Sequence, residues 1–380
     1  MSRDLSSKIP DCPATVWDDK DIDFSKEIKK TDVTCPFEWE APSSVTPEYF
    51  AENKQKIKDV LLKHGCVWFK GFDLTKTENG FRQFYESLKM EPCLDPIHTS
   101  GLRSFASERD AIYEEVNKQS LSQHYIGLHQ ESTHKKTATY GAFVCFKPAT
   151  IKGGEFLIAD AAKILADLDP KIRDEIYEKG IRISVSNLDL DFLKMTGPLK
   201  EPLQESAKSL IETLVAPKFD MELEMIYGSD GKPMRLQAVE QKASPVNRHP
   251  VTKQPLWFCN IHNHARYLRD NRPCGVPEVG MTEVYYGDLT RIPEHVLDEI
   301  NKVSQKNIAR IPMQPGDVLL CDNYRILHGR DIFDGDRYHA VTWFKDGFKE
   351  GSNELTEDTE ASKPGNFMNS IINKFLVDSF

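Results

Sequence analysis

Three polar residues that are divided between two remote parts of the chain limit the folds that this sequence can adopt. His129 and Glu131 stand one residue apart in His129-Gln130-Glu131, and His328 lies near the other end. Because side chains alternate along a β-strand with period two, His129 and Glu131 project to the same side of one strand. A third partner for them must come from a distant segment. The spacing therefore predicts that two remote strands meet, and it excludes a local helical site of the His-Glu-x-x-His kind.

Two imidazoles and one carboxylate on one face of a metal, with the other positions open, form the ligand set of non-haem Fe(II) oxygenases. The same set can hold zinc in a hydrolase that activates water. A jelly-roll binding module without catalysis is a third interpretation. The chain has 11 histidines, and His124, His134 and His339 are competing candidates because they flank the proposed ligands. His134 is three residues beyond Glu131, so it would face the opposite side of a continuing strand.

The chain around His328 has the pattern of short strands joined by turns. Pro315-Gly316-Asp317 is a turn signal, and the apolar run 318–321 that follows it is typical of a buried strand. Asp322-Asn323 predicts a second turn, and another short run ends at His328. The stretch 337–344 is rich in β-branched and aromatic residues, which favours a further strand. Arg337, at its start, can pair bidentately with the carboxylate of a bound acid.

Between residues 63 and 344 the chain resembles the taurine dioxygenase-like (TauD/TfdA) family of Fe(II)/2-oxoglutarate oxygenases. The order and spacing of several motifs carry this likeness: 63–72, His129-Gln130-Glu131, Gly153-Gly154-Glu155, Pro315-Gly316-Asp317, His328-Gly329-Arg330 and Arg337. The resemblance implies that His129, Glu131 and His328 bind Fe(II), and that Arg337 binds the far carboxylate of 2-oxoglutarate, with dioxygen as the other co-reactant. Arg330 is an alternative to Arg337, although its place beside the ligand suits a structural ion pair better.

Two residues depart from the family pattern. Most relatives carry Asp where this chain has Glu131, which places it nearer the clavaminate synthase-like branch, whose substrates are often amino acids or their derivatives. A carboxylate at this position also argues against halogenation, because family halogenases have a small residue there. Phe156 stands where relatives often have a Thr that helps to hold 2-oxoglutarate. We therefore expect that contact to come from elsewhere, with Thr342 or Tyr338 as candidates.

The resemblance implies oxidation of an unactivated C–H bond, with release of succinate and carbon dioxide. The expected substrate is a small, amino-acid-derived molecule. Hydroxylation, desaturation and oxidative cyclisation, such as the ring closure of kainoid biosynthesis, all remain open because the ligand motif does not choose among them. Candidate substrate-binding residues are the charged or imidazole side chains Arg248, His264, Arg266 and His339; a solvated surface position is the alternative for each arginine.

Composition narrows the class of protein without choosing the reaction. The chain has 380 residues and a net charge of −10, so it has no basic footprint for nucleic acid or an anionic membrane surface. No stretch approaches the ~20 apolar residues needed to span a bilayer. Its eight cysteines include no Cys-x-x-Cys pair, and Cys66, Cys145, Cys259 and Cys321 lie in apolar runs, as buried thiols do. A cytoplasmic protein with a small-molecule substrate is expected.

The expected fold is α+β but mainly β: a double-stranded β-helix (a jelly-roll, cupin-like core) flanked by helices. Residues 1–45 are expected to be an irregular arm, 46–349 one domain with 185–255 as a candidate lid or substrate region, and 350–380 an acidic linker and a C-terminal helix. That helix would dock on its own subunit or on a neighbour in a homo-oligomer. Individual elements are expected at 46–65, 78–88, 161–168, 170–179 and 293–303 as helices, and at 140–147, 221–227 and 256–261 as strands.

Overall fold

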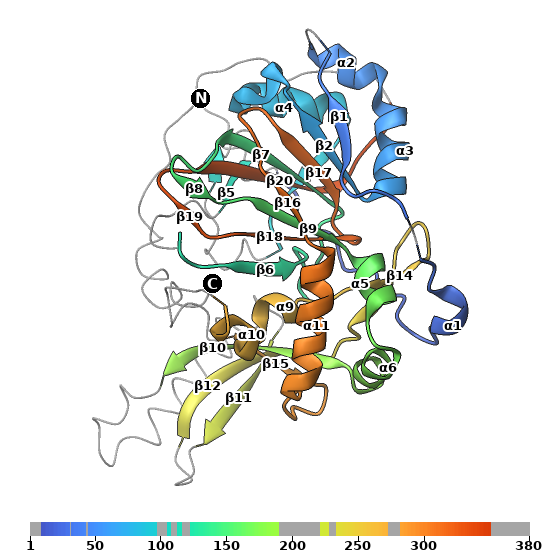
Figure 1. Cartoon of the computed structure of the whole chain (residues 1–380), viewed down its shortest axis with the longest axis vertical. Coiled ribbons are helices and arrows are strands. Elements are labelled where there is room, and N and C mark those ends of the chain that lie inside the picture. The colour runs from blue at the N-terminus through green and yellow to red at the C-terminus, as the bar shows by residue number, and fades with distance from the viewer. Residues whose placement is uncertain are drawn as a thin grey trace.

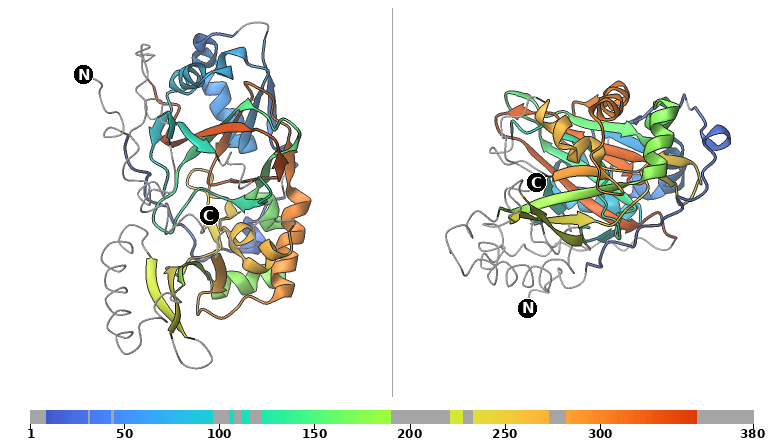
Figure 2. Two further views of the ribbon diagram at one scale, coloured as in Figure 1. Left: turned by 90° about the vertical axis from the view of Figure 1, so that its left-hand side faces the viewer. Right: turned by 90° about the horizontal axis from the view of Figure 1, so that it is seen from below.

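Two β-sheets face each other in a mixed α/β fold, and helices cover their outer faces (Figure 1). The computed structural model describes residues 9–30, 32–42, 45–96, 105–107, 112–115, 122–189, 221–227, 233–272 and 282–350. Figure 2 shows the same layers from the side and from below. The two sheets hold the residues that the sequence singles out, so their pairing decides where the candidate site lies.

The larger sheet has eight strands in the order β1-β2-β17-β7-β20-β5-β4, with β3 paired to β20. The facing sheet has the order β16-β9-β18-β6. The strands of the larger sheet are β1 (Phe37–Glu40), β2 (Cys66–Lys70), β3 (Glu91–Cys93), β4 (Phe105–Ser107), β5 (Ile112–Glu115), β7 (Tyr140–Lys147), β17 (Val318–Asp322) and β20 (Tyr338–Asp346). Those of the facing sheet are β6 (Ile126–His129), β9 (Phe156–Asp160), β16 (Ala309–Ile311) and β18 (Ile326–Arg330).

Along each central strand, side chains point alternately into the space between the two sheets and toward the helices on the outer face. Both sides are hydrophobic, which explains why the central strands are continuous apolar runs. In β17, Leu319 packs between the two sheets, whereas Val318 and Leu320 pack against the helices above. In β9, Phe156 faces the space between the sheets and Leu157 faces the helices below. The strands predicted over 140–147 and 318–321 are therefore confirmed, and they are buried on both faces.

The helices above the larger sheet are α2 (Pro47–Glu52), α3 (Lys54–His64) and α4 (Glu78–Ser87). Gly65 ends α3 in the left-handed region with φ 78°, as the sequence predicts for a stop at that position. The expected single helix over 46–65 is divided at Asn53. Below the facing sheet lie α5 (Ala161–Asp167), α6 (Pro170–Lys179) and α11 (Glu294–Asn307), so those three predicted helices are confirmed. No helix among the described residues is long and apolar enough to cross a membrane.

Part of the region expected as a lid forms a separate small sheet in the order β11-β12-β10-β15. Its strands are β10 (Ile181–Asp189), β11 (Met221–Tyr227), β12 (Pro233–Glu240) and β15 (Thr282–Tyr286). A hairpin of β13 (Val246–Arg248) and β14 (Pro255–Trp257) follows, and its buried Val246 and Trp257 belong to the lower core. The hairpin at 246–257 therefore packs into the lower core. The strand expected over 256–261 is shorter, because α9 (Ile261–His264) starts there, followed by α10 (Arg266–Asp270).

The N-terminal segment differs from the irregular arm that the sequence suggested. Residues 37–40 form β1, which pairs in parallel with β2, and α1 (Phe24–Glu27) is a short helix. Short paired strands β8 (Lys152–Gly153) and β19 (Phe333–Asp334) and the 3-10 helix Asp73–Lys76 complete the described elements. The helix predicted in 350–380 lies outside the described residues, apart from Glu350 itself.

Candidate metal centre

The two histidines of the predicted metal site face each other across adjacent strands. β18 pairs with β6 in antiparallel fashion, and His328 is the direct partner of His129. Their ring centroids are 4.3 Å apart. Nδ1 of His129 lies 2.9 Å from the carbonyl oxygen of Gly127, so this nitrogen donates and Nε2 keeps its lone pair for a metal.

Glu131 completes the group just beyond the end of β6. One atom each from His129, Glu131 and His328 lies within 4.8 Å of the other two. The peptide of Glu131 is held by Asn323, whose Oδ1 accepts from the Glu131 N–H at 3.0 Å and whose Nδ2 donates to the Glu131 carbonyl at 3.0 Å. Asn260 holds Gln130 in the same way, at 2.9 and 3.2 Å. Two buried amides therefore fix a segment that no β-ladder holds.

The outer edge of β6 is also fixed by side chains. Leu128 donates its N–H to Nδ1 of His262 at 2.8 Å, and Gly127 donates to Oδ1 of Asn263 at 2.9 Å. His262 therefore carries its proton on Nε2, facing Oδ1 of Asn301 at 3.2 Å. Burial lowers the pKa of His262 well below its usual value, which keeps it neutral in this role. His262 is a structural residue that supports the edge strand.

Gly329 allows β6 and β18 to approach this closely. A Cβ at this position would lie 2.5 Å from the carbonyl oxygen of Ile126 on the neighbouring strand. Any side chain there would push β6 away from β18, and His129 would move with it. The glycine in His328-Gly329-Arg330 therefore has a direct role in bringing the two imidazoles together.

Aromatic rings surround His328 on the side between the sheets. Its ring centroid lies 4.9 Å from that of Phe143 and 5.7 Å from that of Trp343. Phe156 stacks at 6.2 Å with an interplanar angle of 6°. The residue that departs from the family pattern, Phe156, thus packs against a proposed metal ligand. Together these rings exclude water from one side of the centre.

A buried basic group lies on the same inner surface. Arg330 is fully buried and Arg337 is 4% exposed. Both guanidinium groups approach the ring of Phe333, with distances to its centroid of 4.8 and 5.8 Å. Nη2 of Arg330 donates to the carbonyl oxygen of His124 at 2.7 Å, which supports the structural role suggested for it. Burial, and then the charges of Arg337 and Arg330, lower the pKa of His339 well below its usual value, so it stays neutral.

The two residues expected to substitute for the family threonine both point elsewhere. Thr342 sits between Ala340 and Phe344 on the face of β20 that packs toward α2, α3 and α4, whereas Val341 and Trp343 face the space between the sheets. The period of two turns the Thr342 hydroxyl away from His328, so the prediction that Thr342 helps to hold 2-oxoglutarate is corrected. The other candidate, Tyr338, donates its hydroxyl to Glu78 at 2.8 Å.

The two arginines proposed for substrate binding also have other partners. Arg248 is paired with Glu27 and Asp18, at 2.7 and 3.2 Å. The Arg266 side chain is 50% exposed on α10 and pairs with Asp270 at 3.4 Å. Both are therefore corrected to structural or surface positions. His264 lies near the centre: burial lowers its pKa to about 3, with further contributions from the neighbouring His129 and Arg269.

Among the described residues, the candidate metal group contains none of the competing histidines His124, His134 and His339. The ring of His134 packs on Trp17, with centroids 5.4 Å apart. Asp322 accepts from Tyr324 N–H within its turn and lies 2.8 Å from Nε2 of His249, which supports the turn role predicted for the Asp322-Asn323 pair. Sequence reasoning missed Asn323, Asn260 and Asn263, although Asn323 stands in the predicted Asp322-Asn323 turn and the other two lie within four residues of the candidate substrate residue His264.

The residues present fit an iron ion. The donor set is two imidazoles and one carboxylate on one side, which is the set that leaves positions open for co-reactants. The His129 tautomer leaves the correct nitrogen available, and the carbonyl and amide contacts are the kind of outer partners that orient metal ligands. The arrangement defines a mononuclear metal centre between two sheets, with a basic group further along the inner surface.

Comparison with known proteins places this centre in a family. Residues 35–343 match the family model described as taurine catabolism dioxygenase TauD, TfdA family. The chain belongs to this family. It is a dioxygenase, and its cofactors are Fe(II) with 2-oxoglutarate and dioxygen as co-reactants.

Individual relatives are more distant. The dapdiamide synthesis protein DdaC of Enterobacter agglomerans is 27% identical over 296 residues, covering 76% of this chain and 84% of that protein. Among solved structures, PvcB from Pseudomonas aeruginosa has 15% identity and a TM-score of 0.47, covering 81% of this chain and 86% of that one. A taurine dioxygenase from Burkholderia xenovorans has 11% identity and a TM-score of 0.44, covering 84% and 89%.

Proposed function

We propose that this dioxygenase oxidises an unactivated C–H bond of a small, amino-acid-derived molecule, at an iron ion held by His129, Glu131 and His328. One observation carries the proposal. Ligand atoms from β18 and from the end of β6, remote in sequence, lie within 4.8 Å of one another. The family match alone does not require this convergence, and a chain that had lost its activity would not need to keep it.

Each residue has a defined task in this proposal. His129 keeps Nε2 directed to the ion because Nδ1 is bound to Gly127. Arg337 binds the far carboxylate of 2-oxoglutarate by a bidentate contact, and the charge of that carboxylate offsets the repulsion between the buried Arg337 and Arg330. Fe(II) held by His129, Glu131 and His328 would supply the oxidation chemistry, with dioxygen as the oxidant and 2-oxoglutarate as the co-reactant that is converted to succinate and carbon dioxide. The aromatic side chains around His328 exclude water from the reacting carbon.

The substrate class rests on the carboxylate ligand and on a relative. Glu131 is the feature that resembles the clavaminate synthase-like branch, and the relative DdaC is named for the synthesis of dapdiamide. Both support a biosynthetic oxidation of an amino-acid derivative. His264 and His339, which lie near His129 and near Arg337, are the proposed substrate-side residues. Hydroxylation, desaturation and cyclisation differ in where the substrate carbon is held after hydrogen abstraction, so product analysis must choose among them.

The finer points of architecture belong to the same proposal. Two facing, mainly antiparallel sheets with alternating inner side chains support a double-stranded β-helix as the core of one domain over 46–349. We assign β1 to this domain as well, since it extends the larger sheet. The small sheet formed around 181–240 is the proposed substrate-side insertion. Free thiols at the described cysteines support a reducing, cytoplasmic location. Assembly through the C-terminal segment remains a prediction.

The test is spectroscopic and then chemical. Anaerobic addition of Fe(II) and 2-oxoglutarate to the purified protein should give a weak visible charge-transfer band. Glu131→Ala should abolish the band, and Glu131→Asp should keep it, because most relatives carry Asp there. Succinate release with a panel of amino-acid derivatives, followed by mass spectrometry, identifies the substrate. A zinc hydrolase would release no succinate under any condition, and a binding module would consume no oxygen.

A further inference from the structure

We propose that an N-terminal strap, residues 13–27, positions the metal ligand Glu131, and that Thr15 and Arg248 are positioning residues for the iron site. The inference rests on the proposed iron ligands and adds a part of the chain that lies outside the two sheets. The strap runs over the segment that directly follows Glu131, residues 132–137, here called the ligand loop. It is fixed to the body at its other end by β13.

The ligand loop is a closed unit, so a hold on one part of it is transmitted to Glu131. Ser132 and Thr137 form an antiparallel bridge. Thr133 N–H donates to the Lys136 carbonyl at 2.7 Å, and Lys136 N–H donates to the Thr133 hydroxyl at 3.0 Å. These bonds restrict the internal conformation of the loop, so it moves largely as one unit. What fixes the loop against the protein also fixes the peptide of Glu131 at its start.

The strap adds a short strand pairing to this loop. Thr15 donates its N–H to the Lys135 carbonyl at 2.8 Å, and Thr137 donates its N–H to the Pro13 carbonyl at 3.0 Å. The Thr15 hydroxyl donates to the Thr133 carbonyl at 3.2 Å and lies 2.8 Å from the Thr137 hydroxyl. A single side chain, that of Thr15, therefore contacts both arms of the ligand loop.

Trp17 holds the tip of the loop from the same side. Its Nε1 donates to the His134 carbonyl at 2.9 Å, and the two rings pack together. A cavity of about 30 Å³ lies beside this contact, with Ser132, Thr133 and His134 among its lining residues. On the side that faces the cavity, the ligand loop has no closely packed side chains to support it. The contacts from the strap therefore carry more of the positioning than they would beside a filled core.

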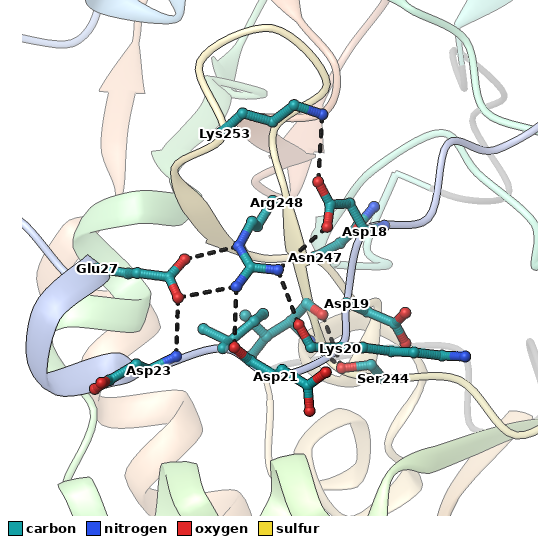
Figure 3. A network of polar contacts seen from close by, with 12 residues as sticks. Asp18, Asp19, Lys20, Asp21, Asp23, Glu27, Ser244, Asn247, Arg248 and Lys253 are labelled. Atoms are coloured by element: carbon teal, nitrogen blue, oxygen red, sulfur yellow. Dashed lines mark hydrogen bonds and ion pairs between the residues drawn. The ribbon is translucent and has the colours of Figure 1, made fainter.

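Arg248 fixes the far end of the strap (Figure 3). Its Nε and Nη2 donate to the two carboxylate oxygens of Glu27 at 2.7 and 2.9 Å. Its Nη1 donates to Asp18 at 3.2 Å and to the Lys20 carbonyl at 2.9 Å, and Nη2 donates to the Asp21 carbonyl at 3.2 Å. The bond from Arg248 lowers the pKa of Glu27 below its usual value. One guanidinium group, whose side chain is 15% exposed, thus ties four strap residues to β13.

The middle of the strap is tied to the turn that already holds Glu131. Asn247 accepts from Asp18 N–H at 2.7 Å and donates to the Val16 carbonyl at 2.8 Å. Val16 N–H donates to the hydroxyl of Tyr324 at 2.9 Å. Tyr324 follows Asn323, the residue that binds both peptide groups of Glu131. The strap thus connects the ligand loop, the Asn323 turn and β13. Displacements of about half an ångström at a ligand are enough to weaken a metal site.

The experiment measures Fe(II) affinity in the full-length protein with saturating 2-oxoglutarate, without oxygen. Thr15→Val keeps the shape but removes the hydroxyl, and it should raise the dissociation constant for Fe(II) about tenfold, the lower end of what partners of metal ligands contribute. Thr15→Ser restores the hydroxyl and should restore the affinity. Arg248→Met, which releases the far end, should act in the same direction. The charge-transfer band should shift or weaken in the two affected variants.

A matched control separates positioning from stability. Lys70 joins the body to Glu38 and Glu40 of β1, at 2.8 and 3.0 Å, so Lys70→Met also removes two ion pairs from the N-terminal segment, but away from the ligand loop. It should leave the Fe(II) dissociation constant unchanged. Lower melting temperatures in Thr15→Val and Arg248→Met with unchanged Fe(II) affinity would overturn the strap proposal, as would equal losses in Lys70→Met. Absence of the band in the wild-type protein would instead overturn the iron site itself.

Discussion

Each of two antiparallel strand pairs in this molecule places two side chains of a metal-binding type opposite each other. In the facing sheet, His129 and His328 are direct partners, with ring centroids 4.3 Å apart. In the larger sheet, Cys66 and Cys321 are direct partners on β2 and β17, with sulfur atoms 3.4 Å apart. Both pairs have the geometry of facing ligands. Their surroundings differ, and the difference shows what a metal site needs beyond two donors.

The cysteine pair lies inside the core between the sheets. Cys66 is fully buried and Cys321 is 2% exposed. Burial, and then the bond to Cys321, raise the pKa of Cys66 well above its usual value, so the group stays a thiol, whereas a metal binds the thiolate. The histidine pair joins the edge strand β6 to β18, with a carbonyl that sets the His129 tautomer and with Glu131 within reach. Two facing donors thus become a site only where protonation state and a third ligand are arranged as well.

Removal of a proposed ligand should have the largest effect on the histidine site. His328→Ala should abolish tight Fe(II) binding and lower succinate release by at least about a hundredfold, since a ligand contributes more than its outer partners do. Metal analysis after desalting and a succinate assay measure the two effects. The fold should persist, because β18 keeps its pairing with β9. Retention of one iron per chain in this variant would contradict the assignment.

The next largest effect concerns the basic group rather than the metal. Arg337→Ala should raise the apparent KM for 2-oxoglutarate about a hundredfold, equivalent to ~2.7 kcal/mol, because it leaves a carboxylate of the co-reactant unpaired in a buried site. The apparent KM of Arg337→Lys for 2-oxoglutarate should lie between those of the wild-type protein and Arg337→Ala, since a lysine keeps the charge but cannot make the bidentate contact.

Fe(II) binding without 2-oxoglutarate is the control for that experiment. It should be unchanged in Arg337→Ala, because the arginine belongs to the co-reactant end and not to the ligand set. A loss of Fe(II) binding with no change in the KM for 2-oxoglutarate would assign Arg337 to the structure of the centre instead.

The sequence predicted two central strands because buried strands follow from short-range rules, whereas the ligand group was implied by the resemblance to the family. Continuous apolar runs predicted strands at 140–147 and 318–321, and the structure buries them on both faces. The one-residue spacing of His129 and Glu131 predicted that one strand carries both residues, and this is wrong for Glu131. β6 ends at His129, so Glu131 keeps its place through Asn323 rather than through a ladder. The distance from β6 to β18 was implied by the motif but fixed by Gly329.

Other contacts could not be predicted because they depend on long-range pairing. Asn260, Asn263 and Asn323 have ordinary turn sequences, and only the folded chain shows that their amides hold the ligand segment. Arg248 looks like a substrate arginine until its partners in the N-terminal strap are known. The prediction for Thr342 was wrong for a simpler reason. Trp343 contacts His328 between the sheets, so the alternation of side chains along β20 places its neighbour Thr342 on the opposite face of the strand.

A smaller effect on Fe(II) binding is expected when Asn323, which holds the peptide of Glu131, is replaced and the three ligands are kept. Asn323→Ala leaves the N–H and carbonyl of Glu131 and the carbonyl of Ala138 without this partner. Unfolding free energy should fall by about 3 kcal/mol, and the Fe(II) dissociation constant should rise about tenfold. Asn307→Ala is the matched control, since its amide binds Asp167 and Val303 at the end of α11. It should lower stability and leave iron affinity unchanged.

The smallest effect on activity should come from the cysteine pair, and this tests the comparison itself. Cys66→Ala with Cys321→Ala should lower unfolding free energy by about 1–2 kcal/mol, because it leaves space in a close-packed layer. Iron stoichiometry and succinate release should not change, since both thiols are buried away from the histidine site and the pKa of Cys66 is raised, which keeps that group from binding the metal as a thiolate. If the double variant instead bound less iron, the thiols would belong to the metal site or to its loading. Two facing donors would then be enough to affect metal binding, without the fixed tautomer and the third ligand that distinguish the histidine pair.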